Sequence, residues 1–124
     1  MRDDRTTHHE RAIVGLSIID PSTIDRIESD LAGYTFADPD CLAIWPALVE
    51  LRRKAFPVAD TRLLSIELLP IGVSVSTIAR LATDAGMPGQ DQYHLSVLVD
   101  RMRLIRLERF QHRLGEVLQT MEIS

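Results

Sequence analysis

The chain has 124 residues and a mass of 14.0 kDa, a length that suits one domain with its own hydrophobic core. Its hydrophobic fraction of 45% and charged fraction of 26% are those of an ordinary globular protein, which argues against a disordered chain. The net charge of −4 argues against a surface built for phosphates, and the single cysteine excludes an internal disulfide. The N-terminus is polar and no apolar run is long enough to span a membrane, so we expect a cytoplasmic protein.

Apolar residues recur at helical spacing and strand-like alternation is nearly absent, so the sequence predicts an all-α protein. We expect a compact orthogonal bundle of about five short helices, followed by one long C-terminal helix. Residues 1–9 are predicted to form a flexible tail, residues 10–90 the globular core, and residues 91–124 the long helix.

The first two helices are expected to form a tight hairpin. The first begins near His9 and carries one apolar stripe: Ala12, Leu16 and Ile19. Gly15 lies inside this helix, which is reasonable if another helix passes close to it. Asp20 and Pro21 form a start signal for the second helix, which we expect to end at Gly33. Its inward residues are Ile24, Ile27 and Leu31.

Three more helices follow, each after a capping residue. Asp38 and the proline after it start the third helix. Its expected inward residues are Leu42, Trp45, Leu48, Val49 and Leu51. Asp60 is expected to cap a fourth helix over residues 61–69, and Ser76 a fifth helix that ends at Gly86. The apolar residues of these two helices are Leu63, Leu64, Leu68, Leu69, Ile78, Leu81, Ala82 and Ala85.

The last predicted helix runs from Asp91 to Met121, and its apolar stripe changes direction halfway along. The first half presents Leu95, Leu98, Val99, Met102 and Ile105. The second half presents a stripe displaced by roughly 110°; its residues are Leu107, Phe110, Leu114, Val117, Leu118 and Met121. Almost no sequence follows to cover this second stripe, so we infer that it is an interface to another chain or to further sequence.

Three arginines accompany the second stripe, on the face that is apolar in the first half of the helix: Arg106, Arg109 and Arg113. They have three interpretations. They form a solvated face paired locally with Glu108 and Glu116, or they contact acidic residues of a partner subunit, or they contact DNA directly. The acidic net charge makes direct DNA contact the least favoured of the three.

Several segments follow one another in an order that is informative as a set. They are Glu10–Leu16 (ERAIVGL), similar to E-x-A-V-L-G; Asp20; Phe36; residues 41–48 (CLAIWPAL), similar to H-x-x-I-[FY]-x-x-[LM]; residues 56–60 (FPVAD) with Leu63 and Leu68; residues 77–81 (TIARL), similar to Y-L-x-x-L; and residues 98–106 (LVDRMRLIR), similar to I-V-[RK]-[ED]-[RK]. This order resembles the N-terminal domain of DnaB-type replicative DNA helicases. The chain departs from that pattern at Cys41, where the family has histidine, and at Val73, where a second glycine is usual.

The resemblance implies a compact helical domain followed by a helix that forms half of a hairpin. The family uses this hairpin to pair subunits within a hexameric ring and to bind primase. We therefore expect a non-catalytic interaction and oligomerisation domain acting in DNA replication. Its expected partners are further copies of itself, as a homodimer or higher homo-oligomer joined through the C-terminal helix, and a primase or helicase loader. The second helix of the hairpin would lie beyond Ser124.

No signature of an enzyme accompanies these helices. The sequence contains no G-x-x-x-x-G-K-[ST], so this chain is not expected to hydrolyse ATP. We expect no cofactor, no metal and no small-molecule substrate. His8 and His9 are interpreted as a solvated tail, and His94 and His112 as surface or interface residues. Cys41 is expected to be a small, half-buried apolar residue.

Paired acidic residues also have simple interpretations. Asp3 and Asp4 are interpreted as tail charge, and Asp38 and Asp40 as part of a helix cap. An alternative function starts from residues 82–87 (ATDAGM), which have the A-x-x-x-G-[VM] pattern of a helix-turn-helix in a dimeric DNA-binding regulator. Against it, the recognition helix would open with Gln-Asp-Gln, and an aspartate facing phosphates is unfavourable.

Overall fold

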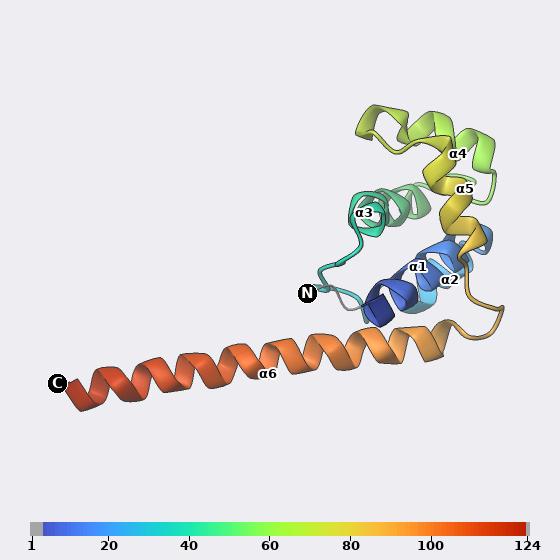
Figure 1. The fold of residues 1–124 in the computed structure, drawn as a ribbon. Helices are drawn as coiled ribbons and strands as arrows, with labels where there is room; N and C mark the ends of the chain where they lie inside the picture. Colours follow the sequence, from blue (N-terminus) through green and yellow to red (C-terminus); the bar gives the residue numbers. More distant parts are fainter. Residues whose placement is uncertain (1–3, 124) are drawn as a thin grey trace.

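The computed structural model describes residues 4–123 (Figure 1). In that range the chain forms six α-helices, one short 3-10 helix and no strand. The elements are α1 (Asp4–Ile19), α2 (Ser22–Ile27), α3 (Pro39–Arg53), α4 (Thr61–Leu68), η1 (Leu69–Ile71), α5 (Val75–Thr83) and α6 (Asp91–Ile123). The predicted all-α fold, a bundle of short helices with one long C-terminal helix, is therefore confirmed.

Helix α1 lies at the centre of the body and contacts α2, α3, α5 and α6. Every residue over 12–18 is buried, which is typical of a helix surrounded by others. Gly15 is the point where α5 crosses α1, because a Cβ there would lie 2.2 Å from the carbonyl oxygen of Leu81. The predicted close passage of another helix at Gly15 is therefore confirmed. The backbone N–H of Gly86 reinforces this crossing by donating to the Ala12 carbonyl over 3.2 Å.

Helix starts depend on local chemistry, and two of the predicted caps are present. The Asp38 side chain accepts from the Cys41 N–H at 3.0 Å, and the Asp60 side chain accepts from the Leu63 N–H at 3.2 Å. The cap predicted at Ser76 is wrong. The Ser74 side chain caps α5 instead, so that helix begins two residues earlier than expected.

The flexible tail predicted for residues 1–9 is wrong for residues 4–9, which form the first turns of α1. Helix α6 packs beside these turns: Thr6 is buried, and the Arg101 guanidinium donates to its hydroxyl at 3.1 Å. Residues 1–3, including Asp3, lie outside the described residues, so the expected tail charge is testable only at Asp4, which begins the helix.

Four of the apolar residues named for the predicted helices are exposed: Ile19, Leu42, Leu63 and Leu69. In α3 the inner face is offset from the predicted one, and Cys41 and Ile44 take the place expected for Leu42. Helix α2 is shorter than expected and ends at Ile27, although Leu31 is still buried in the turn that follows. The short helices bury one narrow face each, so a one-position offset moves a leucine into solvent.

Candidate interaction surface

The first part of α6 is anchored on the body. Leu95 and Leu98 are buried in the core cluster, as the sequence predicts for this half of the helix. At its N-terminus the buried Asp91 carboxylate accepts from the Arg26 guanidinium of α2 at 3.0 Å. The carboxylate also lies at the positive end of the α6 dipole. Both contacts fix the direction in which the rest of the helix leaves the body.

A cluster of rings joins the start of α6 to α1. The Nδ1 atoms of His9 and His94 are 2.8 Å apart, and the rings of His8 and Tyr93 pack against this pair. His94 is buried, which corrects its expected place on the surface; the solvated tail expected for His9 is also wrong. Burial, followed by the neighbouring His9 and His8, lowers the pKa of His94 below its ordinary value of 6.5. The ring of His94 is therefore uncharged near neutral pH.

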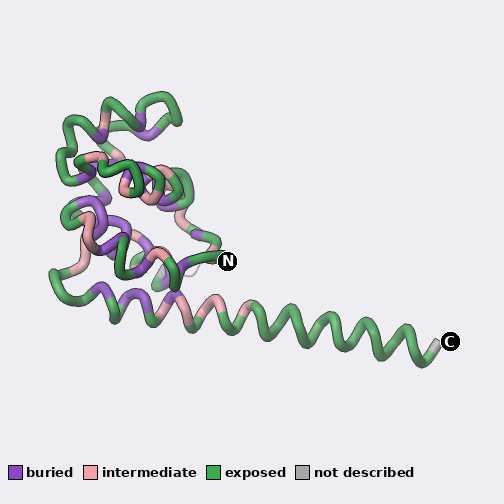
Figure 2. The backbone as a smooth tube through the Cα atoms, turned by 180° about the vertical axis from the view of Figure 1, so that it is seen from behind, coloured by how far each residue is buried: buried purple, intermediate pink, exposed green. Residues whose placement is uncertain are grey.

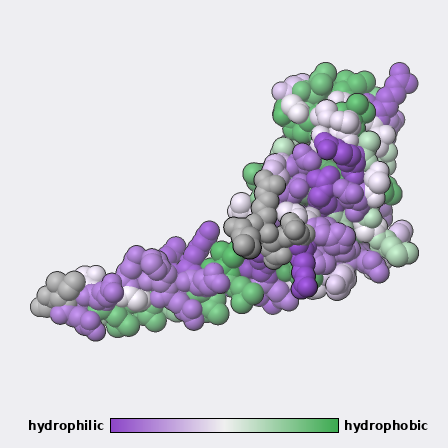
Figure 3. Space-filling view, viewed as in Figure 1, coloured by the Kyte–Doolittle hydropathy of each residue, from purple (hydrophilic) through white to green (hydrophobic). Residues whose placement is uncertain are grey.

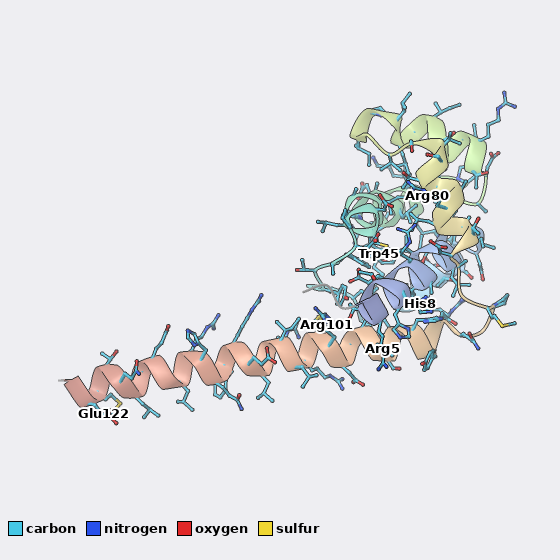
Figure 4. All side chains as sticks on the ribbon, viewed as in Figure 1. Arg5, His8, Trp45, Arg80, Arg101 and Glu122 are labelled. Atoms are coloured by element: carbon cyan, nitrogen blue, oxygen red, sulfur yellow. The ribbon has the colours of Figure 1, made fainter. Side chains whose placement is uncertain are left out.

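Beyond this anchor, α6 leaves the body. Every residue from Arg106 to Glu122 is exposed, and we call this segment the distal arm. Figure 2 shows the change from buried to exposed along the helix, and in Figure 4 Arg101 marks where α6 still lies beside α1 while Glu122 marks the far end. The distal arm buries no side chain against the body.

One face of the distal arm is apolar. The side chains predicted as the second stripe are each about half exposed or more, and we call them the distal stripe: Leu107 (52%), Phe110 (62%), Leu114 (48%), Val117 (54%), Leu118 (52%) and Met121 (67%). Figure 3 shows hydrophobic surface along one margin of the arm and hydrophilic surface along the other. Five of these residues follow one another at alternating spacings of three and four, the repeat of a helix-pairing seam.

The three arginines predicted beside this stripe also lie on the distal arm, and all are exposed. None of them forms an ion pair with a carboxylate of residues 5–122. Glu116, one of their expected local partners, instead contacts His112 at 3.0 Å. Arg106 lies over Gly33, and with Arg109 it lines a small hollow against Tyr34 and Thr35. The arm therefore presents three arginines without ion-pair partners among the described residues, next to an apolar stripe.

Other residues considered at the sequence level are structural. Cys41 is fully buried, more than the half-burial expected, and burial, followed by nearby Asp38, raises the pKa of its thiol, so it is an unreactive core residue. Arg11 of α1 forms ion pairs with Asp38, Asp40 and Asp84, at 3.1, 3.0 and 2.7 Å. Burial opposes its charge, but these carboxylates more than offset that effect and raise the pKa of Arg11. Arg11 thus joins α1 to the start of α3 through Asp38 and Asp40, and to the end of α5 through Asp84, while Asp38 also caps α3.

Sequence reasoning missed the role of Glu10. This side chain is fully buried and its carboxylate accepts from the Tyr34 hydroxyl at 2.5 Å and from the Asp38 N–H at 2.8 Å. It also accepts from the Ala37 N–H. Glu10 therefore holds the segment before α3 against α1. In the sequence, the one signal for such a role is the position of Glu10 in the ERAIVGL segment.

The described residues contain no group of three histidine, cysteine or acidic side chains placed to hold a metal ion. None of the helices in this range combines the length and the apolar character that a bilayer-spanning segment needs. Comparison with protein-family models, with curated proteins and with solved structures finds no match for this chain. The function is therefore inferred from the residues and their geometry.

Proposed function

We propose that this chain is a non-catalytic helical interaction domain that assembles with further copies of itself through the distal arm of α6. The observation that carries the proposal is the distal stripe: apolar side chains, about half exposed or more, aligned along a helix that has left its own body. Exposed apolar stripes of this kind are typical of protein interfaces.

The energetics favour a partner. A helix of roughly 15 residues without tertiary contacts is marginal in water, so the distal arm relies on packing against something else for its stability. Full burial of a leucine or phenylalanine side chain contributes about 1.5–3 kcal/mol, and the stripe offers several at once. The spacing of Leu107, Phe110, Leu114 and Val117 keeps them on one seam, as required for packing against another molecule.

We propose DNA replication as the context, as part of or beside a DnaB-type helicase. Two features support this context: the order of matching segments, and a long helix that follows a compact helical core, which is where the family places its subunit-pairing hairpin. A primase or helicase loader is the second class of partner in this proposal. The test is a titration of the purified domain with the DnaB-type helicase and the primase of the organism that encodes this chain. If the domain binds neither protein, the proposal is contradicted.

The oligomerisation proposal is tested by placing a carboxylate in the distal stripe. Leu114→Asp is expected to reduce the mass measured by sedimentation velocity to that of one chain, because the seam would bury an unpaired charge. Gln119→Asp adds the same charge to another face of the same helix and is the matched control. An unchanged mass for Leu114→Asp, or a monomeric wild type at high concentration, contradicts the proposal.

The alternative, a helix-turn-helix regulator, has weaker support. Its recognition helix would be the start of α6, where Asp91 and His94 are buried and Asp91 is paired with Arg26. A recognition helix needs its first turns free to enter the major groove. A titration with duplex DNA at low and moderate salt discriminates the two, since salt-sensitive, sub-micromolar binding would favour the regulator.

A further inference from the structure

A second apolar surface lies on the opposite part of the molecule from the distal arm. It is a groove between α3 and the α4–η1 segment, and we call it the α3–α4 groove. Its lining residues are Ala47, Glu50, Leu51, Glu67, Leu68 and Ile71. Leu51 and Leu68 are buried and form an apolar floor, while Ile71 is 53% exposed. Figure 3 shows hydrophobic surface over this end of the body.

Each surface carries charged side chains that have no ion-pair partner among the described residues: Glu67 at the groove, and Arg109 and Arg113 on the distal arm. Glu67 forms no ion pair within the described residues, whereas Glu50 forms ion pairs with Arg53 at 3.8 Å and with Lys54 at 3.7 Å. An apolar stripe with unpaired arginines beside it thus has a counterpart in an apolar groove with the unpaired Glu67 beside it.

Pairing of two distal stripes leaves Arg106 and Arg113 without partners. Arg106 and Arg113 occupy the heptad position that precedes the seam residues Leu107 and Leu114. In a parallel pair these arginines would face Gln111 and Leu118 of the other copy. In an antiparallel pair each of these arginines would face residues at the same heptad position of the other helix. Those residues are Arg106, Arg113 and Thr120. Neither arrangement offers them a carboxylate.

We propose that the distal arm of one copy lies in the α3–α4 groove of the next copy, so that the chains assemble head to tail. The distal stripe covers the apolar floor of the groove, and Arg113 lies beside Glu67. In Figure 1 the arm extends away from the body while α4 lies at the body's other end, so a chain does not reach its own groove. Because the two contacting surfaces differ, the assembly closes as a ring or grows as an open chain.

This inference rests on the proposed function, since it names the surface that the distal arm binds. Sedimentation velocity on two variants and on their mixture tests it. Leu114→Asp places a carboxylate in the distal stripe, and Ile71→Asp places one in the α3–α4 groove. Each variant alone is expected to be monomeric. In the mixture, the intact arm of the groove variant binds the intact groove of the stripe variant, so a dimer with one chain of each kind is expected and nothing larger.

Stripe-to-stripe pairing gives a different result. Leu114→Asp would again be monomeric, but Ile71→Asp would still assemble alone and the mixture would form no new species. That outcome overturns the head-to-tail inference and leaves the proposed function intact, whereas full assembly of Leu114→Asp overturns both. Ile66→Asp is the matched control: Ile66 is 63% exposed on α4 and does not line the groove, so assembly is expected to persist.

Exchanging the charges of Glu67 and Arg113 distinguishes the loss of this contact from misfolding of a variant. Glu67→Arg and Arg113→Glu are both expected to weaken assembly, because each places like charges beside one another at the contact. The chain carrying both changes restores an opposite pair at every contact and is expected to assemble like the wild type. If both single variants weaken assembly and the double variant does not recover it, the pairing of Arg113 with Glu67 is wrong.

Discussion

The Nδ1 atoms of His9 and His94 lie 2.8 Å apart and join the start of α1 to the start of α6. In this contact one ring nitrogen donates and the other accepts. His94 is 5% exposed and its Nε2 atom has no hydrogen-bond partner, because it lies against Gly86. The direction of the distal arm therefore depends on a contact between two titratable groups.

This contact predicts that the domain loses stability in mild acid. The folded pKa of His94 is lower than its unfolded value of 6.5, so the unfolded chain binds more protons and stability falls as pH decreases from about 6.5. Protonation of both rings would also place two positive charges in direct contact. Thermal unfolding from pH 7.5 to pH 5 is expected to show this loss, with a shift of about 4 °C for each kcal/mol.

Two variants separate this contact from general acid effects. His9→Gln keeps a hydrogen-bonding side chain without a titrating ring, and it is expected to reduce the pH dependence, while the part caused by the burial of His94 remains. His112→Gln changes an exposed histidine on the distal arm and is expected to leave the pH dependence as it is. The same acid sensitivity in His9→Gln as in the wild type would show that the ring pair is not its source.

Gly15 and Gly115 predict opposite effects for the same substitution. A Cβ at Gly15 would lie 2.2 Å from the Leu81 carbonyl oxygen and 2.8 Å from the Ala85 Cα, and both are backbone atoms that cannot move alone. Gly15→Ala is therefore expected to destabilise the domain by about 2–3 kcal/mol, as overpacking does. A Cβ at Gly115 meets nothing within 4 Å, so Gly115→Ala is expected to raise helix stability by about 1 kcal/mol.

Chemical denaturation measures the loss of stability caused by Gly15→Ala. Circular dichroism measures the gain in helix content caused by Gly115→Ala. A neutral Gly15→Ala would mean that α1 and α5 separate without loss, which contradicts the tight crossing.

These residues also show which features the sequence could predict. The caps at Asp38 and Asp60 were predictable, because a cap depends on residues within one helical turn. The distal stripe was predictable from periodicity, because its apolar face is displaced by roughly 110° from the face that packs on the body. The faces of the short helices were harder: Leu42 fits the helical repeat almost as well as Ile44, and only the neighbouring helices decide which one is buried.

Contacts between distant segments were beyond sequence reasoning. Glu10 binds groups at positions 34, 37 and 38, and His94 contacts a residue 85 positions away, so no local pattern indicates that either is buried. The α3–α4 groove has no sequence signal either, since its lining comes from two helices and a 3-10 turn. The proximity of these residues is set by the fold as a whole.

Trp45 is expected to be a major contributor to stability. Its side chain is 8% exposed, and its ring lies 5.9 Å from that of Phe36 between centroids. Trp45→Ala is therefore expected to destabilise the domain by about 3–5 kcal/mol, through lost burial and the cavity left behind. Leu42→Ala is the control in the same helix, because Leu42 is 52% exposed and its removal should have little effect. A small shift in the urea midpoint for Trp45→Ala would contradict this role.

Glu10→Gln is expected to destabilise the domain although it is nearly isosteric. The buried carboxylate accepts from the Tyr34 hydroxyl and from the N–H groups of Ala37 and Asp38, whereas an amide presents a donor where one of these acceptors is needed. Loss of charge-assisted hydrogen bonds and an unsatisfied buried group together correspond to about 2–4 kcal/mol. Urea unfolding gives the magnitude, and hydrogen exchange at the Ala37 and Asp38 amides gives the location. Unchanged protection of these two amides in Glu10→Gln would mean that the segment before α3 is held by other contacts.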